Sequence, residues 1–307
     1  HKLLLGSAYR YTWYDDNTPA TQLGEGIAQK NKPVYTSLPG AFAQYEYKAS
    51  DKTTLLTGLR YDYNSEHGSI LSPRFNARWA PNADNTFRLS LGNGYRVVNL
   101  FTEDHAALTG AREVVIRNEL KPEQSYNVNL NYQRYINLAG GFVNLEGSAF
   151  YTYFTNKIVA DFFTDNDLII YDNLSGHAIS KGIALNSELA FTFPLRLHAG
   201  VTLMDVYQVE QTAEGSDERI QQLHAPRFSG TFTASYQFRN LGLTLDYTGS
   251  VKGPMYLPVQ ENDFRPEQSP WFSLQNVQAT KTLREGLEVY GGVKNLLNFI
   301  PKHPLMR

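Results

Sequence analysis

The sequence predicts an all-β protein whose antiparallel strands form a barrel that crosses a membrane. Apolar and polar side chains alternate along most of the chain, which is the period of two that separates the faces of a β-strand. Several alternating segments run about 10–14 residues, roughly twice the usual strand length in soluble sheets and enough for a tilted crossing of a bilayer. Short and long connections alternate between these segments, as is typical of transmembrane barrels.

The expected strands number about 13, and no amphipathic helix longer than about two turns is expected. In chain order they fall near residues 3–14, 40–49, 55–63, 74–79, 87–92, 126–132, 142–154, a hairpin within 156–176, 182–193, 197–209, 228–237, 243–248, 272–282 and 287–293. Their polar faces favour Asn, Ser, Thr, Gln and Gly, which suits a water-filled or plugged lumen. Their apolar faces end in Tyr, Phe or Trp, as expected of girdles at the membrane interfaces.

The expected connections fall into two classes. Short turns are expected near residues 51, 83, 139, 194, 240 and 285. Long connections are expected at 15–37, 97–124, 158–175, 210–225 and 252–270, with a shorter one near 67 as the exception. A soluble sandwich or propeller would also show alternation, but it does not require such long strands.

Composition excludes several functions. The 307 residues have a formal net charge of -2 and a pI of about 6.4, so no nucleic-acid partner is expected. The chain has no cysteine, which excludes disulfides, thiolate metal sites and Cys nucleophiles. It also lacks a Gly-rich phosphate loop, a His-Glu-x-x-His pair and a Gly-x-Ser-x-Gly elbow. We therefore expect neither an enzyme nor a resident cofactor.

Several short motifs together resemble one family. In order, they are Leu-Ser-Pro-Arg-Phe-Asn at 71–76, Phe-Arg-Leu-Ser at 87–90 followed by Gly-Tyr-Arg at 94–96, Asn-Leu-Phe at 99–101, Leu-Lys-Pro-Glu-Gln-Ser at 120–125, and Val-Lys-Asn-Leu-Leu-Asn at 293–298. Over nearly the whole chain this series is similar to the C-terminal part of the β-barrel of TonB-dependent outer-membrane receptors.

The resemblance implies a roughly 22-stranded barrel in the outer membrane of a Gram-negative bacterium. Residues 1–307 would be its C-terminal portion, a fragment with the plug domain absent and the last strand missing. The implied function is import of a scarce metal complex, with a ferric siderophore first and haem or cobalamin next. Implied partners are membrane lipid, the metal-chelate small molecule, the TonB complex acting through the missing plug, and a surface lipoprotein. The alternatives are a passive porin or adhesin barrel and a soluble all-β binding protein.

The same resemblance points to a loop histidine as a haem ligand. His105 lies between Tyr95-Arg96-Val97-Val98 and Asn118-Glu119-Leu120, where haem receptors of this family place a histidine, and imidazole is a suitable axial ligand for haem iron. We therefore list His105, Tyr95 and Arg96 as candidate ligand-binding residues. The alternative is that His105 is a solvated loop residue beside acidic neighbours.

Other candidates lie in the hairpin within 156–176 and along the strands. The aromatics Phe162, Phe163 and Tyr171 either contact a flat ligand or pack the hairpin against neighbouring loops. Aspartates of the same hairpin either bind calcium or are solvated: Asp161, Asp165, Asp167 and Asp172. Strand arginines either attract an anionic chelate or pair with acidic side chains: Arg10, Arg60, Arg74, Arg78 and Arg88.

Overall fold

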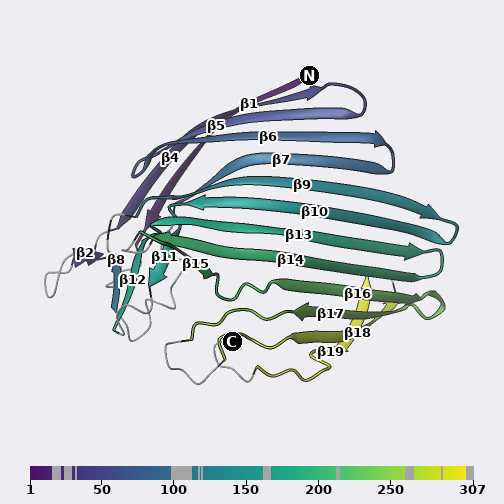
Figure 1. The fold of residues 1–307 in the computed structure, drawn as a ribbon. Helices are drawn as coiled ribbons and strands as arrows, with labels where there is room; N and C mark the ends of the chain where they lie inside the picture. The colour runs from purple at the N-terminus through teal and green to yellow at the C-terminus, as the bar shows by residue number, and fades with distance from the viewer. Residues whose placement is uncertain are drawn as a thin grey trace.

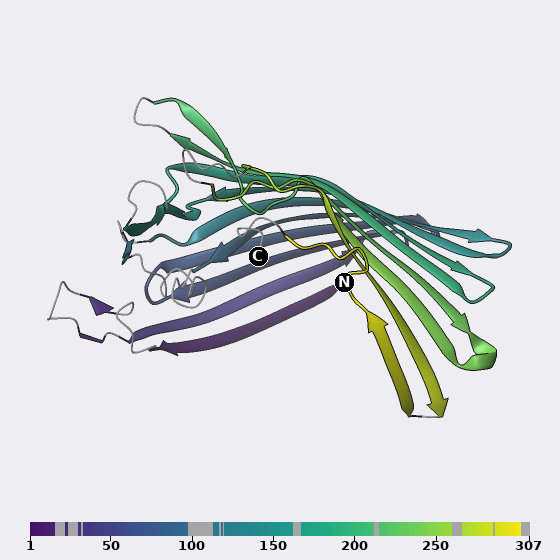
Figure 2. The same ribbon diagram turned by 90° about the horizontal axis from the view of Figure 1, so that it is seen from below.

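The protein is one large curved β-sheet with smaller strand groups at one end (Figures 1 and 2). The computed structural model describes residues 1–15, 22–23, 30–31, 33–97, 113–116, 118, 120–161, 167–211, 215–259, 266–284 and 286–301. Thirteen strands follow one another in a single antiparallel path, and this confirms the number predicted from sequence. In order they are β1 (Lys2–Tyr14), β4 (Val34–Lys48), β5 (Thr53–Asn64), β6 (Gly68–Asn82), β7 (Asn85–Arg96), β9 (Glu123–Leu138), β10 (Gly141–Thr155), β13 (Gly176–Phe191), β14 (Leu195–Gln211), β16 (Phe228–Phe238), β17 (Leu243–Lys252), β18 (Phe272–Arg284) and β19 (Leu287–Val293).

The remaining strands are short and lie in the long connections. β15 (Asp217–Gln221) pairs with β14 at the edge of the main path. A three-stranded sheet consists of β11 (Ile158–Asp161), β12 (Leu168–Asn173) and β8 (Glu113–Ile116), and a two-stranded sheet consists of β2 (Gln22–Leu23) and β3 (Lys30–Asn31).

Helical structure is limited to one short segment in the part of the chain that the structure describes. This is the 3-10 turn η3 (Arg239–Leu241) between β16 and β17. Across these same residues, no helix has the length and apolar character needed to span a membrane.

Several strands are longer than their sequence patterns predicted, and in two of them the added residues lie beyond a proline. β6 covers 68–82 instead of 74–79, and β4 begins at residue 34 instead of 40. Each contains a proline, Pro73 or Pro39, of the kind that ends a strand when the sequence is considered alone. Pairing with one neighbour continues each strand past its proline, since β1 pairs with residues 34–39 of β4 and β5 pairs with residues 68–73 of β6.

Register places the apolar residues of neighbouring strands in continuous rows. One row crosses nine strands without a polar side chain: Tyr47, Leu55, Ala77, Leu89, Leu130, Ala149, Ile183, Leu203 and Phe228. The row beside it, on the opposite face, is almost entirely polar: Lys48, Thr54, Arg78, Arg88, Asn131, Ser148, Ala184, Thr202 and Ser229. The sheet therefore has one apolar face and one polar face throughout.

The apolar face has no protein covering in the described residues. Leu130 and Ile183, in the middle of that face, are 54% and 49% exposed. A soluble sandwich would bury such residues against a second sheet, so its central expectation is not met. An uncovered apolar face of this extent fits contact with lipid acyl chains.

Aromatic and charged side chains mark the two limits of the apolar face. Near the short turns, Trp79, Phe87 and Tyr132 stack with ring centroids 5.1 and 4.5 Å apart. Toward the other end, Lys181 and Asp205 follow Ile183 and Leu203 on the same face, and Asp205 accepts bonds from Arg219 at 2.8 and 2.9 Å. This change from apolar to charged residues fits the border between acyl chains and polar headgroups.

Short and long connections lie at opposite ends of the sheet, as predicted. The exception near residue 67 is a tight turn between β5 and β6 that is organised by Asn64. The Asn64 side chain is buried, and its Oδ1 accepts bonds from the backbone N–H groups of Glu66 at 2.8 Å and His67 at 3.1 Å. Gly68, with a φ of 75°, follows this turn in the left-handed region that favours glycine.

Replacing Asn64 with alanine should lower the free energy of unfolding by about 1–2 kcal/mol, because two backbone donors lose their acceptor. The measurement is a urea titration of the full-length protein in detergent. Asn64→Asp keeps an acceptor oxygen and should lose clearly less. Equal losses in the two variants would contradict the role given to the Oδ1 acceptor.

Candidate ligand site at the long-connection end of the sheet

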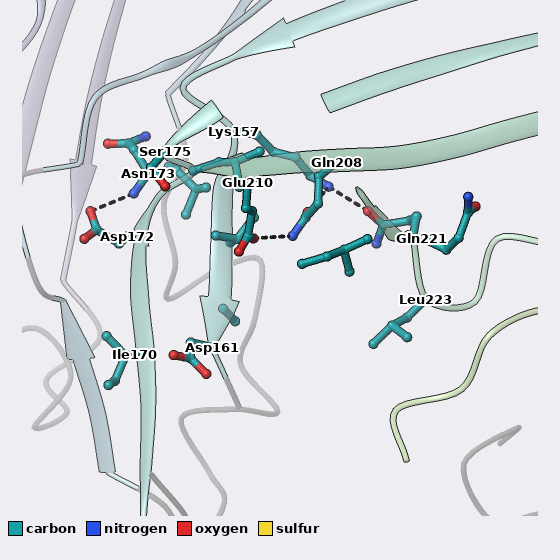
Figure 3. A pocket seen from close by; sticks show the side chains of 16 residues that line it. Lys157, Asp161, Ile170, Asp172, Asn173, Ser175, Gln208, Glu210, Gln221 and Leu223 are labelled. Atoms are coloured by element: carbon teal, nitrogen blue, oxygen red, sulfur yellow. Dashed lines mark hydrogen bonds between the residues drawn. The ribbon is translucent and has the colours of Figure 1, made fainter. Parts of the chain in front are cut away.

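The described residues enclose a cavity of about 700 Å³ on the polar face, at the end where the long connections lie (Figure 3). Its wall is formed by residues of 157–161, of 170–175, and of 208–210 together with 220–223. The first of these groups belongs to the β10–β11 turn and β11. The second belongs to β12 and the residues after it, and the third to β14, β15 and the residues after β15. Residues far apart in sequence therefore meet here.

Lys157 ties two of these segments together. Its Nζ donates to Gln222 Oε1 at 2.6 Å and to Gln208 Oε1 at 3.4 Å. Burial lowers the pKa of the Lys157 ammonium, while the carboxylates of Glu123 and Glu210 act in the opposite direction. The amine is therefore a partly desolvated cation that is satisfied mainly by neutral amide oxygens.

The cavity wall also contains three carboxylates. Glu210 accepts a bond from Gln208 Nε2 at 2.7 Å, and both side chains appear beside Lys157 in Figure 3. Asp172 accepts hydrogen bonds from Asn118 Nδ2 and from the backbone N–H of Asn173, both at 2.8 Å. Asp161 is the third carboxylate that lines the cavity. Hydrogen-bonding groups are thus abundant around the space.

An ion pair fixes the first segment of the wall to the main sheet. Arg96, at the end of β7, donates to Glu123 Oε2 at 2.9 Å, and Glu123 Oε1 accepts from the backbone N–H of Ile158 at 2.9 Å. Glu123 is buried, with 9% of its surface exposed. Its carboxylate therefore joins β7, β9 and β11 at one point.

The three-stranded sheet brings two long connections side by side. β12 pairs antiparallel with β11 and parallel with β8, which belongs to the connection between β7 and β9. Ile169 and Tyr171 of β12 form a small hydrophobic cluster with Leu120, Ile158 and Ala160. Burial of these side chains stabilises the arrangement.

The structure separates the sequence-predicted candidates that it describes. Tyr171 is 4% exposed and belongs to the hydrophobic cluster, so it packs the hairpin, which is the second of the two roles considered for it. Tyr95 lies on the apolar face with Leu91, because it is four residues further along β7, whereas Arg96 lies on the polar face. Arg96 is connected to the cavity wall through Glu123, and Tyr171 belongs to a cluster with Ile158 and Ala160, which line the cavity. A ligand-binding role of Tyr95 stays a prediction.

The other candidates fall outside the described residues or stay untested. His105, Phe162 and Phe163 lie outside the described residues, so the haem and aromatic-ligand assignments stay predictions. Of the aspartates considered for calcium, Asp161 and Asp172 line the cavity. Within the described ranges, no group of three or more His, Cys, Asp or Glu side chains is placed to bind a metal ion.

Strand arginines take up local partners. Arg60 forms a bidentate ion pair with Asp62, in which its Nε and Nη2 donate to the two carboxylate oxygens at 2.6 and 2.7 Å. Arg88 donates to Asn131 Oδ1 at 3.1 Å. The geometry of Arg60 matches the alternative of pairing with an acidic side chain, whereas Arg88 bonds neutral amides, so its role stays a prediction.

Sequence reasoning missed the residues closest to the cavity, namely Lys157, Gln208, Glu210 and Gln222. Gln208 and Glu210 continue the polar face of β14, so alternation could have placed them on that face. No local sequence pattern shows that Lys157, in a turn 51 residues before Gln208, donates a hydrogen bond to it. That contact depends on how β13 returns the chain to β14.

Comparison with known proteins adds independent information. A family model described as "TonB dependent receptor-like, beta-barrel" matches residues 1–296. Among curated proteins, the ferrienterobactin receptor of Escherichia coli (strain K12) is 22% identical, over 89% of this chain and 38% of the relative. The chain thus spans well under half the length of that relative.

Solved structures show the same fold. The ferric enterobactin receptor from Pseudomonas aeruginosa superposes with a TM-score of 0.71 at 19% identity, over 96% of this chain and 45% of the other. The siderophore receptor PirA from Acinetobacter baumannii gives 0.72 at 17% identity, over 96% and 48%. The FrpB iron transporter from Neisseria meningitidis gives 0.71 at 18% identity, over 97% and 49%.

Proposed function

This chain belongs to the TonB-dependent receptor β-barrel family, and on that premise we propose that it is the C-terminal portion of the barrel of a ferric siderophore receptor. The family locates it in the outer membrane of a Gram-negative bacterium. Its apolar face then contacts lipid, its polar face lines the lumen, and the long connections face the outside. The whole receptor would bind the chelate outside and import it with energy supplied by TonB.

The observation that supports this function most directly is the cavity at the extracellular end of the lumenal face, whose wall combines polar and aliphatic side chains. A volume of about 700 Å³ is suitable for a medium-sized chelate, since small-molecule pockets span roughly 300–1,000 Å³. The side-chain amides and the one ammonium in its wall can donate to the oxygen-rich periphery of a siderophore, the carboxylates can accept from its N–H or O–H groups, and the aliphatic side chains can contact its apolar parts. The siderophore receptors among the relatives agree with this assignment.

Arg96 and Glu123 would keep the cavity wall in place during binding. Their ion pair and the Glu123 bond to Ile158 hold β11 against the main sheet. The iron is cargo in this proposal, since the siderophore's own oxygens surround the metal. The barrel binds the periphery of the complex and needs no protein ligand to the iron.

The test uses the full-length receptor in a strain that lacks it and cannot make its own siderophore. Growth under iron limitation is measured with a panel of ferric siderophores, haem and cobalamin, in cells with and without a functional TonB complex. We expect one ferric siderophore class to restore growth only when both receptor and TonB are present. Growth on haem alone would shift the substrate to haem, and TonB-independent uptake would favour a passive porin.

A further inference from the structure

Resting on the proposed function, we infer that the chelate this receptor takes is neutral or cationic, as in ferric tris-hydroxamates, and that the site selects against trianionic ferric tris-catecholates. The argument uses the distribution of charge between the two ends of the molecule and the groups that line the cavity. It concerns the ligand class at the site already described.

The extracellular connections are strongly acidic. Taken between the strands of the main path, they cover residues 15–33, 65–67, 97–122, 156–175, 212–227 and 253–271. They contain 18 Asp and Glu against 9 Lys and Arg, a net charge of -9. The rest of the chain contains 12 acidic and 19 basic residues, a net charge of +7, which together give the overall -2. The long connections therefore carry a net negative charge, whereas the rest of the chain carries a net positive charge.

The described lining of the cavity also has more acidic than basic side chains. It has the carboxylates of Asp161, Asp172 and Glu210 and, as its one cation, Lys157. A cavity with walls of low dielectric constant concentrates the field of such groups, so the excess of carboxylates acts on any charged ligand inside.

Lys157 supplies one positive charge against these three carboxylates. Its amine already donates to Gln208 and Gln222, and desolvation opposes its charged form. Arg96, the cation nearest to this wall along β7, bonds Glu123 on the main sheet. In the described part of the wall, then, no cluster of arginine or lysine faces the space in the way that recognition of a polyanion requires.

Ferric tris-hydroxamates present hydroxamate oxygens and neutral or cationic arms, whereas a ferric tris-catecholate has three negative charges. Amide and hydroxyl side chains can donate to or accept from chelates of the first class, and carboxylates can accept from them. No negative charge of such a chelate is then left without a counter-charge. The second class would bring three anions beside three carboxylates. We expect the affinity ratio to favour the neutral or cationic class by at least about 10-fold at low salt, narrowing as salt screens the repulsion.

The experiment measures quenching of tryptophan fluorescence in the purified full-length receptor in detergent. Three probes are titrated: a neutral ferric tris-hydroxamate, a cationic ferric tris-hydroxamate and a trianionic ferric tris-catecholate. Glu210→Gln removes one cavity charge and keeps an amide oxygen near Gln208, so the preference should shrink severalfold. Glu188→Gln is the matched control, because Glu188 faces the lumen at the opposite end, beside His198.

The outcomes separate the inference from the proposed function. Tighter binding of hydroxamates, reduced by Glu210→Gln and unchanged by Glu188→Gln, supports the inference. Equal or tighter binding of the catecholate overturns it and leaves siderophore transport standing. Binding of none of the ferric chelates, together with no growth on them, overturns the proposed function and the inference with it.

Discussion

Replacing Gly182 with alanine is expected to destabilise the barrel by about 1–3 kcal/mol, in the range of overpacking in a well-filled interior. Gly182 lies on β13, between β10 and β14. A Cβ there would clash with the carbonyl oxygen of Leu203 and lie 2.7 Å from Cζ of Phe150. One of these groups is backbone in a paired strand, so relief requires the β13–β14 ladder to shift.

Gly58→Ala is the matched control for this change. Gly58 also lies within an interior strand, but a Cβ there meets Ala43 O at 3.8 Å, which is an ordinary contact. The measurement is the urea midpoint of the full-length protein in detergent, together with the amount assembled in the outer membrane. We expect a lower midpoint and reduced assembly for Gly182→Ala alone. Equal behaviour of the two variants would show that the β13–β14 pairing accommodates the methyl group.

Replacing Glu123 with alanine is expected to weaken chelate binding by roughly 5- to 100-fold. The change removes the acceptor of the Ile158 N–H and the carboxylate bonded by Arg96. A buried donor left without a partner costs about 1–3 kcal/mol, and about 1.4 kcal/mol corresponds to a tenfold change in affinity. Because Ile158 lines the cavity, this loss should loosen β11 and the two strands paired beyond it.

Two further variants distinguish the backbone contact from the ion pair. Glu123→Gln keeps an acceptor for Ile158 and should lose much less affinity than Glu123→Ala. Arg96→Ala should cost only about 0.2–1 kcal/mol, since the Arg96 side chain is 56% exposed and solvent screens the pair. Limited proteolysis reports loosening of 158–173 independently of ligand. Binding within twofold of wild type for Glu123→Ala would contradict this role of the carboxylate.

Most of the barrel followed from the sequence because alternation is a local property. Each strand position has a face fixed by its neighbours two residues away, so the apolar row through Leu89, Leu130 and Ile183 could be anticipated strand by strand. Composition located the short turns for the same reason. Strand limits were less certain where proline interrupts the pattern, as Pro73 does in β6.

The candidate site was only partly accessible to the same reasoning. Arg96 was identified through its motif, and the structure connects it to the cavity. Tyr95 was named beside it, although neighbouring residues of a strand point to opposite faces, and Tyr171 proved to be a core residue. These two placements depend on which face meets lipid and on which loop covers the hairpin.

The sequence by itself determined an antiparallel membrane barrel, because the period of the side chains is a local property of the chain. Only the tertiary structure decided which connections meet. The parallel pairing of β8 with β12 and the contact of Lys157 with Gln208 and Gln222 join segments tens of residues apart. Their physical origin is the register and curvature of the whole sheet, which set where each loop emerges and what it can contact.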